Sequence, residues 1–226
     1  MSLPFIDRTD AGLQLATRLE RLRGRADVLV LGLPRGGIPV AAVIARSIGA
    51  PLDSLAVRKL GVPGHEELAM GAVASGGVRV LNHDVIRALR IPDAAVEAAT
   101  RREMAELQRR ESAYRDHRPV AELSGKTVML VDDGIATGST MLAALRGARA
   151  RGARSVIVAA PVMSAEAQAA MTRSADGCET VATPEPFGGV GAWYMDFTQT
   201  SDREVRDLLN QQGGDIEAGA GHGPKR

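Results

Sequence analysis

The sequence has little of the residues on which several classes of protein depend. Its 226 residues include one cysteine, Cys178, which excludes internal disulfides and suits a reducing compartment. The four histidines are scattered, so no His/Cys cluster has zinc-ligand spacing. No apolar run approaches the length of a membrane span, and the first residues lack a basic-then-apolar signal pattern. We therefore expect a cytoplasmic protein without a membrane partner.

The chain also lacks an excess of charge of either sign. Its 28 lysines and arginines against 27 acids leave a net charge of +1, which argues against nucleic acid as a partner held by bulk charge. Arginines and glutamates alternate over residues 101–111, which is typical of a solvated helix with mixed-sign pairs. An RNA-facing helix is the alternative interpretation of that stretch.

Strand and helix patterns alternate along the chain, which predicts an α/β fold with a largely parallel sheet. We expect one domain over 1–212, with a core at about 25–182, a helical insertion at about 84–117 and a disordered tail at 213–226. The strands are expected at 27–33, 52–57, 68–73, 78–81, 128–131, 155–162 and 179–182.

The most informative segment, residues 128–140, reads Val-Met-Leu-Val-Asp-Asp-Gly-Ile-Ala-Thr-Gly-Ser-Thr. It predicts a buried strand, then two acids, then a loop that opens a helix near Thr137. Amides at a helix start lack internal partners, so such a loop can direct several of them at one anion. Hydrogen bonds to a charged group contribute about 1.5–3 kcal/mol each, against about 0.3–1 kcal/mol from the helix dipole.

Asp132 and Asp133 cannot bind the anion that the loop binds, because like charges repel. They suit sugar hydroxyls, a hydrated magnesium ion or a sugar carbon that gains positive charge, so a phosphorylated ribose fits both halves of the segment. The alternative is an Asp-Asp-Gly turn before a capped helix. A Walker loop is excluded because no lysine follows Gly138, and the dinucleotide fingerprint is absent.

Residues 131–140 resemble the phosphoribosyl-pyrophosphate (PRPP) motif of type I phosphoribosyltransferases. The resemblance implies a central, mainly parallel sheet flanked by helices, with a small hood formed by the N-terminal segment and about residues 183–212. It implies that Asp132 and Asp133 are the catalytic acids that hold the ribose, with Mg²⁺ bound through PRPP and these two carboxylates. The 5′-phosphate would be bound by Gly134, Ile135, Ala136, Thr137, Gly138, Ser139 and Thr140.

Two further segments could meet the pyrophosphate group. Arg35, Gly36 and Gly37 follow a predicted strand and are similar to the family's pyrophosphate loop, and Arg58 and Lys59 end the next strand. The following residues, 60–67, are rich in glycine and proline and could close over the site as a loop. The alternatives are a tight turn and solvated surface charges.

Four of the six aromatic residues lie between Phe187 and Phe197. Phe187, Trp193 and Tyr194 could stack on a heterocyclic base, or they could close the sheet edge as an apolar plug. Enzymes of the family that act on 6-oxopurines carry an acid where this chain has Ala136, whereas adenine enzymes can have alanine there, so the acceptor stays open.

The resemblance implies an enzyme that transfers the 5-phosphoribosyl group of PRPP to a nitrogenous base and releases pyrophosphate. A non-catalytic regulator that senses PRPP or a nucleotide is the alternative, and another sugar-phosphate binder is a third. The oligomeric state is open, with a homodimer as one option.

Overall fold

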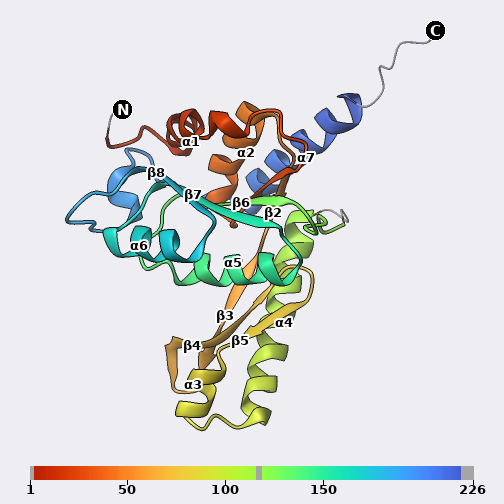
Figure 1. Ribbon diagram of the computed structural model, residues 1–226, viewed down its shortest axis with the longest axis vertical. Coiled ribbons are helices and arrows are strands. Elements are labelled where there is room, and N and C mark those ends of the chain that lie inside the picture. The colour runs from red at the N-terminus through yellow and green to blue at the C-terminus, as the bar shows by residue number, and fades with distance from the viewer. Residues whose placement is uncertain (1–2, 116–118, 220–226) are drawn as a thin grey trace.

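The computed structural model describes residues 3–115 and 119–219, which form two sheets and the helices packed around them (Figure 1). The larger sheet is parallel, with strands in the order β2-β1-β6-β7-β8. All positions of β1 and β6 are buried, as their apolar runs predicted, and the α/β class is confirmed. Its strands are β1 (Val28–Gly32), β2 (Leu52–Ser54), β6 (Thr127–Val131), β7 (Ser155–Val162) and β8 (Gly177–Ala182).

Helices cover both faces of the parallel sheet. Side chains alternate between the faces of a strand, so Val30 packs in a cluster with Leu15 of the first helix, whereas Leu31 packs in a second cluster with Met141. The first layer holds α1, α2 and α7, and the second holds α5 and α6 (Figure 1). These helices are α1 (Arg8–Ala16), α2 (Gly37–Ile48), α5 (Ser139–Ala150), α6 (Ala165–Ser174) and α7 (Asp202–Gly219).

A second, antiparallel sheet in the order β3-β4-β5 extends away from the parallel sheet (Figure 1). It packs against two helices around a separate core that includes Leu60, Met70 and Leu107. The elements of this unit are β3 (Val57–Val62), β4 (His65–Ala74), β5 (Val78–Leu81), α3 (His83–Ala88) and α4 (Asp93–Arg115).

Two expectations are wrong in this unit. The single strand expected over 52–57 is divided between β2 and β3, and the loop expected at 60–67 is a hairpin of β3 and β4 that turns at Pro63 and Gly64. Glycine and proline fit a tight turn as well as a loop, and Gly64 has a positive φ of 77°. The helical insertion is therefore part of a larger unit that also contains the antiparallel sheet.

The hood joins both ends of the chain. The amide of Phe5 donates to the carbonyl of Trp193, and the amide of Met195 donates to the carbonyl of Phe5, both at 2.8 Å. Residues 202–212, expected in the hood, instead belong to α7, whose Val205 and Leu209 are buried in the core beside α2.

Helix α7 also continues through residues 213–219, which we expected to be disordered, while 220–226 lie outside the described residues. Within the described ranges, no helix is both long enough and apolar enough to cross a membrane.

Candidate active site at the carboxyl end of the parallel sheet

The two adjacent acids lie where β6 ends, at the carboxyl edge of the parallel sheet. The chain leaves the sheet through Asp132 and Asp133, and Ile135 then pairs with Met163 beyond the end of β7. The amide of Ile135 donates to the carbonyl of Val162 at 2.9 Å. This bridge fixes the chain directly after the acids, so their position is set by two neighbouring strands.

The Pro34–Gly37 turn packs against these acids. A Cβ atom at Gly36 would lie 2.0 Å from Oδ2 of Asp133, and one at Gly37 would lie 2.4 Å from the carbonyl oxygen of Val131. Real Cβ atoms do not approach so closely, so any larger residue would displace the turn or the acids. The structure thus brings together the predicted pyrophosphate turn and the predicted catalytic pair.

Burial and mutual repulsion act on the two carboxyl groups. Burial, followed by the charge of Asp133, raises the pKa of Asp132 well above its usual range. Burial also raises the pKa of Asp133, although Arg8 opposes that shift. Groups that resist ionisation and lie at a strand end are candidates for function.

Sequence analysis missed Arg8, which contacts the pair from α1. Its Nε lies 2.8 Å from Oδ2 of Asp133, and its Nη1 donates to the carbonyl of Thr198 at 2.7 Å. The guanidinium carbon also lies 4.2 Å from the ring centre of Phe197. No motif surrounds Arg8, so only the folded chain shows this contact.

Several hydrogen-bond donors of the loop after the acids have no acceptor among the described residues. Among the described residues, the backbone amides of Ala136, Thr137 and Gly138 have no acceptor. Gly138 has a φ of 75°, and α5 begins at the next residue, Ser139. The side chains of Thr137 and Ser139 are exposed and lie 3.1 Å apart at their hydroxyl oxygens. The loop therefore has the unpaired amides and the exposed hydroxyls that a phosphate-binding loop needs.

The predicted cations lie beside both the turn and the loop. Arg58 and Arg35 line one cavity of about 290 Å³, and Arg58 also lines a second cavity of about 300 Å³ with Lys59 and Thr140. The described lining of neither cavity includes the two acids. Arg58 is not free, because its Nε donates to Oε2 of Glu103 at 2.9 Å.

The aromatic segment lies against the acids, with unequal exposure of its rings. The hydroxyl of Tyr194 donates to the carbonyl of Asp133 at 2.6 Å, and its ring contacts the rings of Phe5 and Phe197. Burial raises the pKa of Tyr194 and shields its ring, so the apolar-plug interpretation fits this residue better than base stacking. Phe187 and Trp193 are half-buried, and the Trp193 indole donates to the carbonyl of Phe187 at 2.8 Å.

The described residues contain no cluster of three or more acids, histidines or cysteines that could hold a metal ion. Asp132 and Asp133 are adjacent oxygen donors, which suits Mg²⁺ if the ligand's own oxygens complete its coordination.

Comparison with known proteins adds to this geometry. The family model described as "Phosphoribosyl transferase domain" matches residues 11–188. Two strains of Mycobacterium tuberculosis each have a relative named as an assumed phosphoribosyl transferase, 51% identical over 217 residues, which is 96% of this chain and 49% of the relative. The chain thus spans about half the length of these curated relatives.

A solved structure has the same fold over almost its whole length. The crystal structure of TT1426 from Thermus thermophilus is 41% identical, with a TM-score of 0.85, and the match covers 92% of this chain and 98% of that one. With the family match and the parallel sheet, acid pair and hood described above, the chain belongs to the phosphoribosyl transferase domain family and has the type I fold.

Proposed function

We propose that the protein transfers the 5-phosphoribosyl group of PRPP to a nitrogenous base and releases pyrophosphate. The observation that carries this proposal is the contact between the acids after β6 and the Pro34–Gly37 turn, next to a loop with unpaired amides. These three features correspond to the three parts of PRPP: ribose, pyrophosphate and 5′-phosphate. Membership of the family supports phosphoribosyl transfer in general.

The open loop would bind the 5′-phosphate. The amides of residues 136–138 and the hydroxyls of Thr137, Ser139 and Thr140 would donate to its oxygens. Gly134 and Ile135 would hold the loop in place, because Ile135 is bridged to β7 and a Cβ at Gly134 would lie 2.4 Å from Cγ1 of Val190. The phosphate would fix the sugar in one orientation, which lowers the entropic cost of the reaction.

Asp132 and Asp133 would bind the ribose hydroxyls and stabilise the reacting carbon. Cleavage of the bond between C1 and the pyrophosphate oxygen leaves positive charge on the sugar ring, and carboxylates at a partly buried site stabilise that charge strongly. Their raised pKa values mean that ionised carboxylates are costly in the free protein. A cationic transition state removes part of that cost, so it would be bound more tightly than the substrate.

The leaving pyrophosphate would meet the glycine turn and the cations beside it. Arg35 lies in the turn, and Arg58 and Lys59 begin β3. One guanidinium group can donate two parallel hydrogen bonds to phosphate oxygens. These arginines would therefore neutralise the negative charge of the pyrophosphate as it departs. None of the side chains that the structure describes pairs with Lys59, which leaves its ammonium group available.

Magnesium would be held by PRPP oxygens together with Asp132 and Asp133. When bound, it would supply positive charge that neutralises the pyrophosphate. The absence of a larger acid cluster in the described residues fits an ion that arrives with the substrate.

The acceptor base would lie beside Phe187 and Trp193, whose rings are only half-buried. Tyr194 would hold the backbone of Asp133 in position through the hydrogen bond from its hydroxyl to the Asp133 carbonyl. Ala136 is exposed and has a methyl group where a 6-oxopurine would need an acid, so adenine or another base without that requirement suits this site better.

The single half-buried cysteine fits a cytoplasmic location.

The test mixes protein, PRPP and Mg²⁺ with a panel of bases and measures pyrophosphate release. We expect one base to give release that depends on PRPP, and we expect Asp132→Ala/Asp133→Ala to abolish it. Normal PRPP binding without release for any base or amine would reject the enzyme and leave a sensing protein as the conclusion.

A further inference from the structure

Helix α4, which the proposed function does not use, forms one wall of a cavity rich in arginine. The cavity has a volume of about 290 Å³ and lies between the Pro34–Gly37 turn, the start of β3, α4 and the start of α7. Its charged and hydroxyl side chains are Arg35, Arg58, Arg109, Arg110, Tyr114 and Asp202. Arg109 and Arg110 are exposed and paired with Glu106, as the sequence predicted for a solvated helix face, and both also line this cavity.

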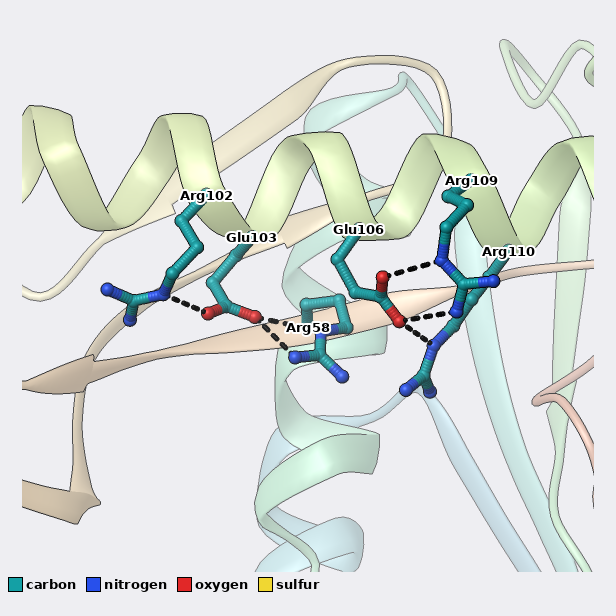
Figure 2. Close-up of polar contacts among 6 residues, drawn as sticks. All are labelled: Arg58, Arg102, Glu103, Glu106, Arg109 and Arg110. Carbon is teal, nitrogen blue, oxygen red and sulfur yellow. Dashed lines mark hydrogen bonds and ion pairs between the residues drawn. The ribbon is translucent and has the colours of Figure 1, made fainter.

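Glutamates of α4 hold these arginines in place (Figure 2). Glu106 accepts from Nε of Arg109 at 2.8 Å and from Nε of Arg110 at 2.7 Å. Glu103, one turn earlier, accepts from Arg58 of β3 at 2.9 Å and so ties the strand to the helix. The guanidinium groups are thus oriented before any ligand arrives, which reduces the entropy lost on binding.

The lining of the cavity carries an excess of positive charge. Four of its residues are arginines, and Asp202 is the only carboxylate in the described lining. With Glu103 and Glu106, which pair with these arginines from outside the lining, four guanidinium groups meet three carboxylates. Arg35 lies 3.4 Å from that carboxylate, and Tyr114 also interacts with it, so Asp202 is already engaged. Four guanidinium groups around one cavity favour an anion with several oxygens.

We propose that this cavity binds a diphosphate group and that α4 supplies Arg109 and Arg110 as its ligands. This inference rests on the proposed function for the roles of Arg35 and Arg58. Arg35 and Arg58 come from the turn and β3, and Arg109 and Arg110 come from α4. Two linked phosphates offer more oxygens to four guanidinium groups than a single phosphate does, which favours a diphosphate.

The test measures the binding of inorganic pyrophosphate, with orthophosphate for comparison, to the 226-residue protein by calorimetry. We expect Arg109→Gln/Arg110→Gln to weaken pyrophosphate binding about tenfold, because two charged donors are lost. The matched control is Arg87→Gln/Arg101→Gln, which removes two exposed arginines of the same unit that do not line the cavity. It should bind within about twofold of the unchanged protein.

Glu106→Gln tests the proposal in the opposite direction. The amide oxygen can still accept from Arg109 and Arg110 and so keep them oriented, but the negative charge that competes for them is removed, so pyrophosphate should bind about threefold more tightly. A gain in affinity cannot come from damage to the fold. Unchanged or weaker binding in this variant would overturn the inference, as would unchanged binding in the double arginine variant.

The two proposals fail in different ways. If the double arginine variant binds pyrophosphate normally while the unchanged protein releases pyrophosphate from PRPP with some base, only the role of α4 is rejected. If pyrophosphate binding depends on Arg109 and Arg110 but no base gives release, the cavity assignment stands and the transferase proposal is rejected.

Discussion

Nε of Arg8 lies 2.8 Å from Oδ2 of Asp133, although 125 residues separate the two in the sequence. Both side chains are largely buried, with 12% and 13% of their surfaces exposed. The same guanidinium binds the Thr198 carbonyl and covers the ring of Phe197. Arg8 therefore links α1, the hood and an acid of the site.

Replacement of Arg8 by alanine should destabilise the protein and reduce turnover. It leaves the Asp133 carboxylate buried without its cation and should lower the free energy of unfolding by about 1–3 kcal/mol. The pKa of Asp133, already raised by burial, should rise further without Arg8. As the pH is lowered, Arg8→Ala should therefore lose pyrophosphate release at a higher pH than the unchanged protein does.

Arg8→Lys keeps the positive charge but not the planar guanidinium group that contacts both Asp133 and the Thr198 carbonyl. It should therefore recover part of the stability lost in Arg8→Ala. Arg23→Ala, an exposed substitution in the same N-terminal region, is the control and should change little. Equal unfolding curves and pH profiles for Arg8→Ala and Arg23→Ala would show that the observed contact has no role in solution.

Asp133→Asn should weaken turnover more than PRPP binding. The amide keeps an oxygen that can accept from Arg8 and the ribose, but it lacks the negative charge that stabilises a cationic C1. We expect kcat for pyrophosphate release to fall about a hundredfold, while the Kd for PRPP changes less than about threefold. Parallel losses in kcat and affinity would place Asp133 in substrate binding alone.

The sequence predicted the acids, the loop and the turn because each depends on neighbouring residues. Residues 128–140 contain the strand, the acids and the helix start within thirteen positions, and the structure places all of them at one sheet edge. Arg8 was not predictable in this way, because its contact depends on how α1 packs against α2 and β7. The role of Tyr194 was also ambiguous, because its hydroxyl bonds a backbone carbonyl, which leaves no pattern in the sequence.

A further misinterpretation concerned the residues before α4. Gly61, Pro63 and Gly64 favour a loop by local propensity, but pairing of β3 with β4 turns them into a hairpin. The prediction of mixed-sign pairs on α4 is confirmed, because Glu106 pairs with the exposed Arg109 and Arg110 three and four residues on. Sequence periodicity gives no information about a neighbouring element, so the contact of Arg58 of β3 with Glu103 was not predicted (Figure 2).

Gly36→Ala should disrupt the acid pair directly. The added methyl carbon would lie 2.0 Å from Oδ2 of Asp133, so the turn or the carboxylate must move. We expect a loss of about 1–3 kcal/mol in the free energy of unfolding and at least a tenfold loss of pyrophosphate release. Gly177→Ala is the matched control, because its methyl carbon would approach no closer than 3.4 Å to Ile157. Similar effects of both substitutions on activity would contradict the close contact.

Asp132→Asn should stabilise the protein while it removes activity. The pKa of Asp132 is raised in the folded state, so ionisation at neutral pH favours the unfolded chain, in which the carboxyl ionises near its usual value of about 3.9. The amide removes that cost and keeps an oxygen for the bond from the Asp133 amide, now 2.9 Å long.

The gain should be about 1–2 kcal/mol near neutral pH, as is common when a costly functional group is replaced. Its pH dependence follows from the direction of the shift. Below about pH 4 both states of the unchanged protein are protonated, so the two proteins should unfold alike, and the difference should grow as the pH rises from there toward the raised pKa of Asp132. Denaturant unfolding of both proteins between acid and neutral pH measures this difference. A variant that is less stable than the unchanged protein near neutral pH, or a difference that does not vary with pH, would show that the folded state bears no cost from this carboxylate.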